Sequence, residues 1–435
     1  MSATTLLHGW GRYPRIEARL EVPASPRDCA RALGEPLIAR GLGRSYGDSA
    51  LGARVLSTRW LDHFVAFDDT TGVLECEAGV SLGDILRLAV PRGWFLAATP
   101  GTRHVSVGGA IAADVHGKNH HLDGSFGDHV LDMQVLLGNG DVMQASANEN
   151  SELFRAVCGG MGLVGVVLRA RLQLLRIASA QIVETTIKAP SLDAVLEAFD
   201  AHRAARYSVA WIDCLARGGA LGRSLLMLGE HAPDGPLVAQ DAAPKPVPFD
   251  MPPWLLNRAS AGAFNALYYG RVRRAMQTRT LPLEQYFYPL DALAHWNRLY
   301  GKPGLVQYQF VVPRAAGPGA LREVIRRIAD SGCGAFLAVL KLFGPANANL
   351  LSFPMEGYTL ALDFKAEPRT FALLDALDPV VLDAGGRIYL AKDARMSEAT
   401  FKRGYPRWSE FEEARVRWHA RGRFASAQSR RLGLQ

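Results

Sequence analysis

Apolar and polar positions in the first 176 residues alternate over short segments separated by glycine and proline, a pattern typical of a mixed α and β domain. We expect an extended arm and a short helix over residues 1–34, followed by a short strand, a glycine-rich turn and a strand meander. The segment SLGDILRLAVPRGW predicts a helix, because Ser81 is a favourable N-cap, the apolar residues share one side, and Pro91 and Gly93 end it.

A hairpin, a helix and a long strand follow. VLDMQVLLGNGDVMQAS predicts two strands joined by Asn139-Gly140, because this dipeptide favours the tight turns of hairpins. NSELFRAVCGG predicts a helix that ends at Gly159 and Gly160. MGLVGVVLRARLQLLRI then predicts a long buried strand.

The pattern changes near Ala178, where we interpret strand, helix and strand segments as the start of a second domain. Its proline-rich middle, near residues 230–262, has little periodicity and predicts a mobile loop. Two helices are expected at ALREVIRRIADSG and RTFALLDALDPVVLDAG. The segments that predict strands of an antiparallel sheet are YFYPLD, GLVQYQFVVP, AFLAVLKLFG, GYTLALDFK and, last, RIYLAKDARM.

One run departs from both helical and strand periodicity. Residues 99–130 contain six glycines and five of the eleven histidines, and their apolar residues are too interrupted for an ordinary strand or amphipathic helix. Glycines leave backbone amides open to a ligand, and amides gathered in a turn bind pyrophosphate. Val107, Ala110 and Ile111 within the run indicate burial against a flat partner, so we favour a cofactor site over a polar surface loop.

A second glycine-rich turn, GLGRSYGDS, has the spacing G-x-G-x-x-x-G at Gly41, Gly43 and Gly47. This spacing is one residue longer than the dinucleotide fingerprint of Rossmann folds, and no helix is predicted directly after it. The turn therefore indicates a different type of nucleotide-binding fold.

Composition excludes several classes of protein. The hydrophobic fraction of 49% is that of an ordinary globular protein. The five cysteines lack CxxC pairs and histidines at zinc spacing, so we expect no metal site and no disulfide framework. Neither a secretory signal nor a membrane-spanning run is found, which favours the cytoplasm. The net charge of +7 is concentrated in a C-terminal segment that predicts a solvated helix, with weak attraction to anionic membranes or phosphorylated substrates as the alternative.

Several motifs together resemble a known family. GLGRSYGDS, PGTRHVSVGGAIAADVHGKNHHLDGSFGDHV, LGNGDV and GGMGLVGVV resemble the flavin-binding domain of the vanillyl-alcohol oxidase type. HGKNHH, QYQFVVP, KLFG and YLAKDAR are similar to the flavin subunits of decaprenylphosphoryl-β-D-ribose 2′-epimerases, which oxidise the ribose 2-hydroxyl. The resemblance implies an α+β fold. Its FAD-binding domain would comprise residues 1–176 and 387–435, and a substrate domain of antiparallel sheet and helices would be inserted at 177–386.

The resemblance also implies FAD as the cofactor. We expect noncovalent binding, because the first loop contains Tyr46 and Asp48 but no histidine of the kind to which related proteins attach flavin. The two glycine-rich loops would wrap the pyrophosphate. The residues implied in FAD binding are Arg40, Gly41, Gly43, Arg44, Ser45, Tyr46, Pro100, Gly101, Thr102, Arg103, Val105, Gly108, Gly109, Ala112, His116, Gly117, Asn119, Gly162, Val164 and Tyr389.

Lys392 and His116 are the candidate catalytic residues. Removing a hydride from an alcohol needs a base for the hydroxyl proton, and either side chain could serve. Lys392, expected on the last strand, could instead place a cation beside the flavin or hold the substrate. Gln307 and Gln309 would lie on one face of a strand. The two amides could bind sugar hydroxyls or a phosphate there, or the face could be an exposed surface of the sheet. The residues implied in substrate binding are Lys118, Trp211, Gln307, Gln309, Lys341, Phe343 and Lys392.

We therefore expect an FAD-dependent oxidoreductase acting on the 2-hydroxyl of a polyprenyl-phosphoryl ribose. A separate NAD(P)H-dependent reductase would complete the epimerisation, and the lipid substrate would bring peripheral contact with a membrane. One alternative is a flavin oxidase of a soluble polyol or aldonolactone. Another is a protein that binds a membrane or a nucleic acid through its basic C-terminal segment, and we do not expect a nucleic-acid partner. Ala361 replaces a cysteine that relatives carry in GYTLALDF, so we expect no thiol at that point of the pocket.

Overall fold

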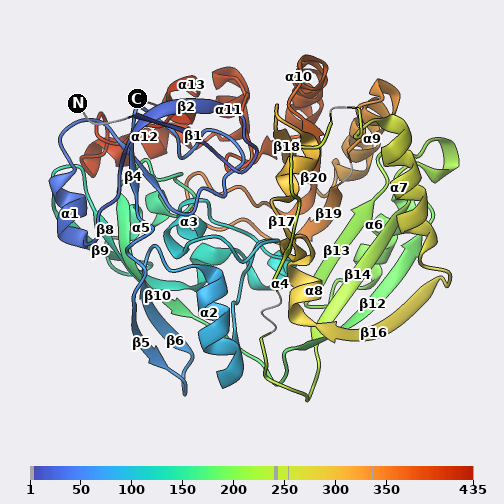
Figure 1. The fold of residues 1–435 in the computed structure, drawn as a ribbon, viewed down its shortest axis with the longest axis horizontal. Helices are drawn as coiled ribbons and strands as arrows, with labels where there is room; N and C mark the ends of the chain where they lie inside the picture. Colours follow the sequence, from blue (N-terminus) through green and yellow to red (C-terminus); the bar gives the residue numbers. More distant parts are fainter. Residues whose placement is uncertain (1–3, 240–242, 253, 336, 435) are drawn as a thin grey trace.

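The computed structural model describes residues 4–239, 243–252, 254–335 and 337–434. Helices and largely antiparallel sheets form two lobes, and both chain ends lie at the top of the first lobe (Figure 1). The α+β class expected from the sequence is therefore confirmed.

A four-stranded sheet lies near the chain ends. The arm expected at the N-terminus is instead a pair of antiparallel strands. The second strand of this pair also lies parallel to a third strand, and this pairing joins the arm to the sheet. The C-terminal segment returns to it, where Leu37 bridges Phe424 and the Ala427 amide donates to the Leu51 carbonyl over 2.7 Å. In sheet order the strands are β1 Thr4–His8, β2 Arg15–Glu21, β4 Arg54–Ser57 and β3 Ile38–Arg40. The flanking helices are α1 Pro26–Arg31, α11 Glu398–Gly404, α12 Trp408–Arg417 and α13 Ala427–Arg431.

A five-stranded antiparallel sheet forms the body of the first lobe. The predicted hairpin is confirmed, with Gly140 at φ +96°, and so is the helix capped by Ser81, whose hydroxyl accepts from the Asp84 amide. In sheet order the strands are β5 Phe64–Asp68, β6 Val73–Glu77, β10 Val166–Gln173, β8 Val130–Leu136 and β9 Val142–Ser146. The associated elements are α2 Leu82–Ala89, α5 Ser151–Val157 and the short pair β7 Trp94–Phe95 and β11 Leu175–Arg176.

The glycine-rich run contains two short helices, although its sequence did not predict regular structure there. They are α3, Val107–Ala112, and α4, His120–Asp123. α3 begins after Ser106, whose hydroxyl accepts from the Gly109 amide. A Cβ on Gly108 would lie only 3.0 Å from the Cβ of Ala78, so small residues allow this helix to press against its neighbour.

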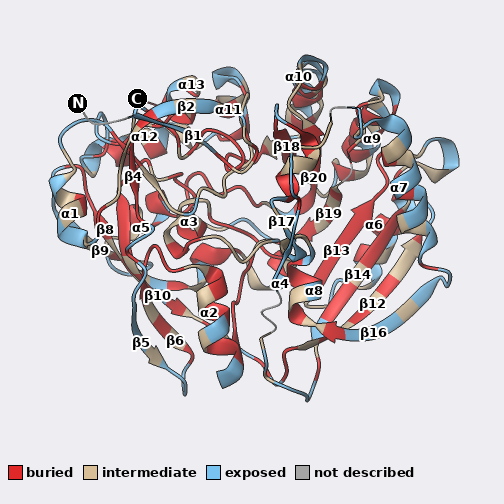
Figure 2. Ribbon diagram, in the orientation of Figure 1, coloured by how far each residue is buried: buried red, intermediate tan, exposed pale blue. Residues whose placement is uncertain are grey.

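An eight-stranded antiparallel sheet dominates the second lobe. Figure 2 shows its inner strands buried and β16 largely exposed at the edge. The longer helices that contact its strands are α6 Leu192–Ala201, α9 Gly317–Ser331 and α10 Pro368–Asp383. In sheet order the strands are β16 Met276–Pro282, β12 Gln181–Ala189, β14 Ser224–His231, β13 Tyr207–Ile212, β19 Ala338–Phe343, β20 Gly357–Lys365, β18 Leu305–Pro313 and β21 Arg387–Ile388.

Two expected strands differ in the structure. YFYPLD forms helix α8, Leu283–Phe287, and a 3₁₀ turn, because its aromatic residues are all buried and Pro289 lacks an amide hydrogen for a ladder. The last strand ends at Ile388, and Lys392 lies in a following turn in which its amide donates to the Tyr389 carbonyl.

The loop expected near residues 230–262 is shorter than predicted. β14 continues to His231, and helix α7, Arg258–Gly270, begins before the expected loop ends. Between them, β15, Lys245–Pro246, pairs in parallel with β17, Leu293–Ala294. Residues 240–242 and 253 of this segment lie outside the described residues, and mobility here stays a prediction.

Asp114 joins the glycine-rich run to the loop between β19 and β20. Its carboxylate is fully buried and its backbone has φ +39°. Each donor is within 2.9 Å, and the groups that donate to it are the hydroxyls of Ser125 and Ser352, the Gly127 amide and the side-chain amides of Asn347 and Asn349. Because His116 follows two residues later, this hub also fixes the position of that ring.

Replacing Asp114 should destabilise the whole fold. Asp114→Asn replaces an accepting carboxylate oxygen by an NH₂ group, which would face the donors that now bind Asp114. We therefore expect the free energy of unfolding to fall by about 2–4 kcal/mol. Urea unfolding followed by tryptophan fluorescence measures this change. Asp69→Asn, in the exposed turn between β5 and β6, is the matched control and should change stability by less than about 0.5 kcal/mol. Equal unfolding midpoints for the two variants would show that the hydrogen bonds to Asp114 do not stabilise the fold.

Candidate active site

A cavity of about 700 Å³ lies between the glycine-rich loops of the first lobe and one face of the eight-stranded sheet. Side chains alternate across a strand, so every second residue of the sheet faces this space. Gln309 and Val339 both lie directly opposite Ala361, and Trp211 lies opposite Val339, which forms one continuous row. The sheet residues that line the cavity include Gln307, Gln309, Ala361, Val339, Lys341, Val209, Trp211, Met227, Glu184 and Arg279.

The two glycine-rich loops meet at one end of the cavity. A Cβ on Gly41 would overlap the hydroxyl of Ser106, so the first loop can touch the N-terminus of α3 only through glycine. Gly43 has φ +66°, and a Cβ on Gly101 would meet no heavy atom within 4 Å. Within the described chain, no hydrogen bond is donated by the amides of Gly41, Leu42 or Gly43. Open amides beside a helix N-terminus fit the pyrophosphate of FAD.

Most residues expected to bind FAD line the cavity. They are Gly41, Gly43, Arg44, Ser45, Tyr46, Pro100, Gly101, Thr102, Val105, Gly108, Gly109, Ala112, His116, Gly162, Val164 and Tyr389.

Four others lie outside the lining. Arg40 donates to the His8 and Ala50 carbonyls and so braces the first loop. The buried Asn119 amide donates to the Ala97 carbonyl and to Asp123, with Gly117 packed against it. The backbone amide of Arg103 donates to Asp291 over 2.8 Å. These residues support the loops, and their direct contact with FAD stays a prediction.

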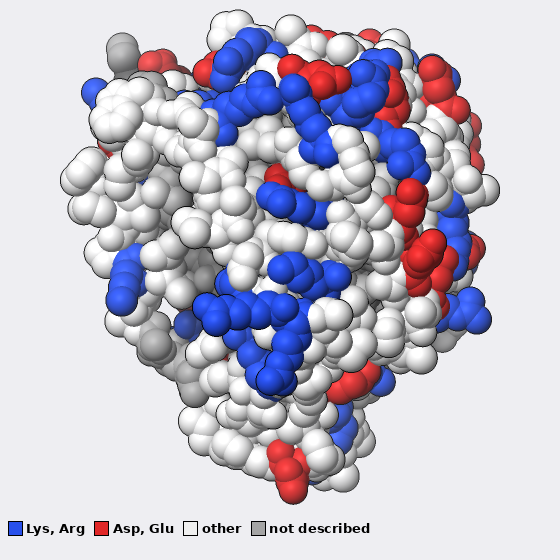
Figure 3. Space-filling view, turned by 90° about the vertical axis from the view of Figure 1, so that its right-hand side faces the viewer, with Lys and Arg blue, Asp and Glu red and all other residues white. Residues whose placement is uncertain are grey.

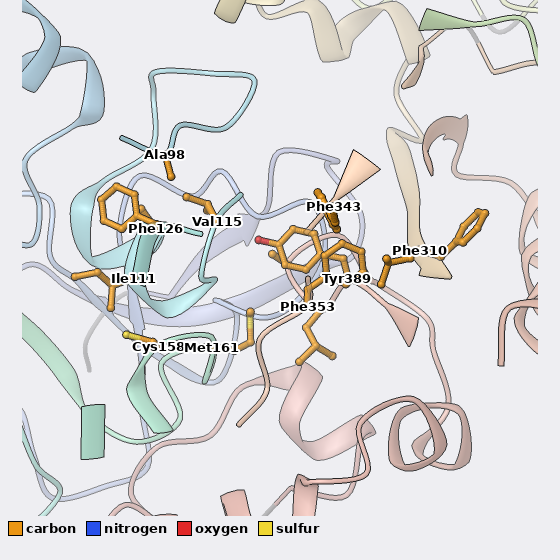
Figure 4. Packing of buried hydrophobic residues seen from close by; sticks show 14 of the residues in the cluster. Ala98, Ile111, Val115, Phe126, Cys158, Met161, Phe310, Phe343, Phe353 and Tyr389 are labelled. Carbon is orange, nitrogen blue, oxygen red and sulfur yellow. The ribbon is translucent and has the colours of Figure 1, made fainter. Parts of the chain in front are cut away.

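His116 lies in a buried cluster of aromatic rings. Its ring centroid is 4.7 Å from Phe343, 5.2 Å from Tyr389 and 5.5 Å from Phe353, and Phe353 stacks on Tyr389 (Figure 4). Phe343 thus supports His116 from outside the cavity lining, although we expected it to contact substrate. Nε2 of His116 is 2.9 Å from Nε2 of Gln309, and Nδ1 has no partner among the described residues.

Burial lowers the pKa of His116 well below its usual range, and the charges of Lys341, His120 and Lys392 lower it further. The imidazole is therefore neutral at physiological pH. Because the side-chain amide of Gln309 donates to Nε2, the ring carries its proton on Nδ1.

Lys392 faces the cavity from its turn and lies over the Tyr46 ring, with Nζ 3.9 Å from the centroid. Nζ has no hydrogen bond to any described residue. Burial lowers the pKa of Lys392, and the buried carboxylate of Asp363 opposes this shift. Gln307 donates to Oδ1 of Asp363, whereas Oδ2 has no partner in the described chain. Lys392 and Asp363 are thus both buried at this side of the cavity, and the carboxylate acts on the lysine through its charge.

Two further lysines line the same cavity. Lys118 donates to the Tyr286 carbonyl and, over 3.2 Å, to the Phe287 carbonyl, and burial lowers its pKa to about 7. Lys341 lies on β19, and burial lowers its pKa to about 8. Buried ammonium groups are costly, so this cavity favours an anion that would pair with them.

Five charged residues of this site were not predicted from the sequence. Asp363 follows Ala361 by two positions, so strand alternation could have placed it on the same side. Glu184 and Arg279 form an ion pair across neighbouring strands of the cavity wall, and Asp291 holds the second flavin loop. Arg271, next to α7, also lines the cavity. Apart from Asp363, no pattern in the sequence distinguished them from surface charges.

The rest of the described chain adds no metal site or membrane span. Among the described residues, no group of three His, Cys, Asp or Glu side chains could hold a metal ion. No described helix combines the length and hydrophobicity needed to cross a bilayer. The five cysteines are buried and unpaired, and Ala361 lines the cavity at the point where we expected no thiol.

Comparisons with known proteins place the chain among flavin enzymes. Residues 25–146 match the model of the FAD binding domain family. The chain is 37% identical to decaprenylphosphoryl-β-D-ribose oxidase of Mycolicibacterium smegmatis, over 100% of this chain and 98% of that protein. It is 36% identical to an uncharacterized protein in the mprA 5′ region of Streptomyces coelicolor, over 82% of this chain and 100% of that protein. A partial match at 30% identity to cytokinin dehydrogenase 5 of Arabidopsis thaliana covers 35% of this chain and 31% of that protein.

The full-length match confirms the resemblance that the sequence motifs indicated, and FAD is the cofactor. The chain therefore belongs to the family of FAD-dependent oxidoreductases that includes decaprenylphosphoryl-β-D-ribose oxidase.

Proposed function

We propose that this enzyme oxidises the 2-hydroxyl of a polyprenyl-phosphoryl ribose to a ketone. The observation that carries the proposal is the convergence of Lys118, Lys341 and Lys392 on one cavity beside the flavin loops. A phosphodiester is an anion at every physiological pH and would pair with these cations. Gln307 and Gln309, on the same strand face, would bind sugar hydroxyls. A soluble polyol or aldonolactone would leave the lysines without an anionic partner.

Bound FAD would accept the hydride that leaves the sugar carbon. Lys392 takes the hydroxyl proton, because burial makes its neutral amine accessible near neutral pH and Nζ is not engaged in a hydrogen bond within the described chain. Once protonated, the same side chain supplies a fixed positive charge in the site. His116 is the weaker base, because its lowered pKa makes proton capture unfavourable and its Nε2 already accepts from Gln309.

The proposed reaction is half of an epimerisation. A ketone at the 2-position has lost its configuration, and hydride addition to its other face would give the epimer. We propose that a separate NAD(P)H-dependent reductase performs this second step. The polyprenyl chain of the substrate would hold the enzyme at a membrane surface.

Removing the proposed base should stop sugar oxidation. We expect Lys392→Ala to slow anaerobic bleaching of the flavin by polyprenyl-phosphoryl ribose about 100- to 10,000-fold. Stopped-flow absorbance measures the rate, with the flavin content of each variant determined first. Lys402→Ala, on helix α11, is the control and should bleach at the wild-type rate. Bleaching of wild-type flavin by a free polyol but not by the lipid-linked sugar would discard the proposed substrate.

Affinity for the phosphorylated substrate should fall as the pH rises. Lys118 and Lys341 lose their charge as the pH passes about 7 and about 8, whereas the phosphodiester keeps its charge throughout. We therefore expect KM to increase at least about tenfold between pH 6.5 and pH 9, since each lost pairing is worth about 1.4 kcal/mol or more. Steady-state kinetics across this range measure the change, and Lys118→Met should flatten it. A constant KM would show that these lysines do not bind the phosphate.

The flavin should leave the protein on denaturation. Tyr46 and Asp48 occupy the first loop, which contains no histidine for covalent attachment. We expect trichloroacetic acid to give a colourless protein pellet and a supernatant that contains FAD. A yellow pellet would contradict noncovalent binding, and His104→Ala would then test attachment at a cavity-lining histidine of the second glycine-rich loop.

A further inference from the structure

Helix α7 presents large apolar side chains to solvent, which an ordinary surface helix turns toward the core. Leu267 is 77% exposed, and Phe264 is 42% exposed and stacks on Tyr268. On the opposite side, Ala261 and Asn265 are buried, and Asn265 donates to Asp213 over 2.7 Å. Tyr268 and Tyr269 pack inward beside Trp211 of β13, and this packing leaves the outward apolar residues of α7 unused.

The turn that leads into α7 extends this apolar surface. Trp254 is 72% exposed, and its carbonyl accepts from the side chain of Asn257, the N-cap of the helix. Leu255 is 36% exposed, and its carbonyl accepts from Ser260. We call these exposed residues together the α7 surface: Trp254, Leu255, Phe264 and Leu267. Large apolar side chains grouped in this way mark an interaction site.

The sequence segment that carries the α7 surface has charges of one sign only. Residues 251–283 contain five arginines and neither lysine nor any acidic residue. Arg279 pairs with Glu184, but Arg273 and Arg274 form no ion pair with an acidic residue of the described chain. Figure 3, which views the side of the molecule that carries α7 and β16, shows basic side chains grouped at the centre of this face among uncharged residues. An anionic partner would complement this face.

The same helix borders the proposed substrate cavity. Tyr268 and Arg271 both line it, and Arg271 donates to the Tyr268 hydroxyl over 2.8 Å. One end of the cavity therefore lies directly beneath the α7 surface. A substrate whose lipid remained in a bilayer could place its phosphate and sugar in the cavity from this side.

We propose that the α7 surface docks the enzyme on an anionic lipid bilayer. Trp254 and Leu267 enter the interface between headgroups and acyl chains, and Arg273 and Arg274 contact lipid phosphates. The proposal rests on the proposed function for the identity of the substrate. Its test measures binding to lipid without substrate, so either proposal can fail alone.

Vesicle flotation of the FAD-loaded enzyme tests this docking. We expect binding to vesicles of an equal mixture of phosphatidylcholine and phosphatidylglycerol, and little binding to phosphatidylcholine alone. Each basic residue near an anionic surface is worth about fivefold in affinity, so Arg273→Glu with Arg274→Glu should weaken binding at least about 30-fold. Arg27→Glu with Arg31→Glu, on the exposed helix α1, makes the same change in net charge and should bind like wild type.

The apolar contribution has its own pair of variants. Trp254→Ser with Leu267→Ser should weaken flotation with the mixed vesicles at least about tenfold, whereas Leu122→Ser with Val142→Ser, exposed in the first lobe, should not. Equal binding to both kinds of vesicle, or wild-type binding by the α7 variants, would overturn the proposal. A third result would also overturn it: wild-type protein that forms a dimer, does not bind vesicles, and becomes monomeric when Trp254 and Leu267 are replaced. The α7 surface would then join two copies of the chain.

Discussion

Burial of several lysines in one cavity is the constraint on which the site depends. An ammonium group removed from water needs a nearby negative charge, a carbonyl or an aromatic face. The protein supplies each of these only in part: Asp363 near Lys392, two carbonyls for Lys118 and the Tyr46 ring beneath Lys392. The cost of burying the lysines is therefore only partly compensated, and their pKa values are lowered. This incomplete compensation makes an anionic ligand favourable and gives the cavity an amine that can accept a proton.

The eight-stranded sheet makes this charged cavity compatible with a stable fold. Alternation along each strand lets polar residues face the cavity while their apolar neighbours pack into the core on the other side. On β18, Gln309 faces the cavity, whereas Phe310 is fully buried in the core. The opposite wall needs different chemistry, because a flavin must approach the backbone closely. Glycine-rich loops and the short helix α3 provide it, and Asp114 fixes those loops to the second lobe.

Local signals in the sequence predicted the elements whose structure is decided locally. Asn139-Gly140 set a hairpin and Ser81 capped a helix, as expected. The prediction for YFYPLD was wrong because long-range burial of consecutive aromatic residues outweighed strand propensity. In the site, too, local features could be predicted and contacts between distant residues could not. Glycine-rich motifs indicated the flavin loops, but Asp291 reaches its partner Arg103 across 188 positions, which no local pattern encodes.

Binding and chemistry in this cavity are linked through protons. The pKa values of Lys118 and Lys341 are lowered chiefly by burial, and a bound phosphodiester would raise them, so binding favours proton uptake near neutral pH. Lys392 must instead be neutral when it meets the sugar hydroxyl. Burial favours this neutral form of Lys392, and the charge of the buried Asp363 carboxylate opposes it, so the two groups together set the protonation of the amine. The same cavity can thus hold cations for the phosphate and a free amine for the reaction, provided that these two tasks fall to different lysines.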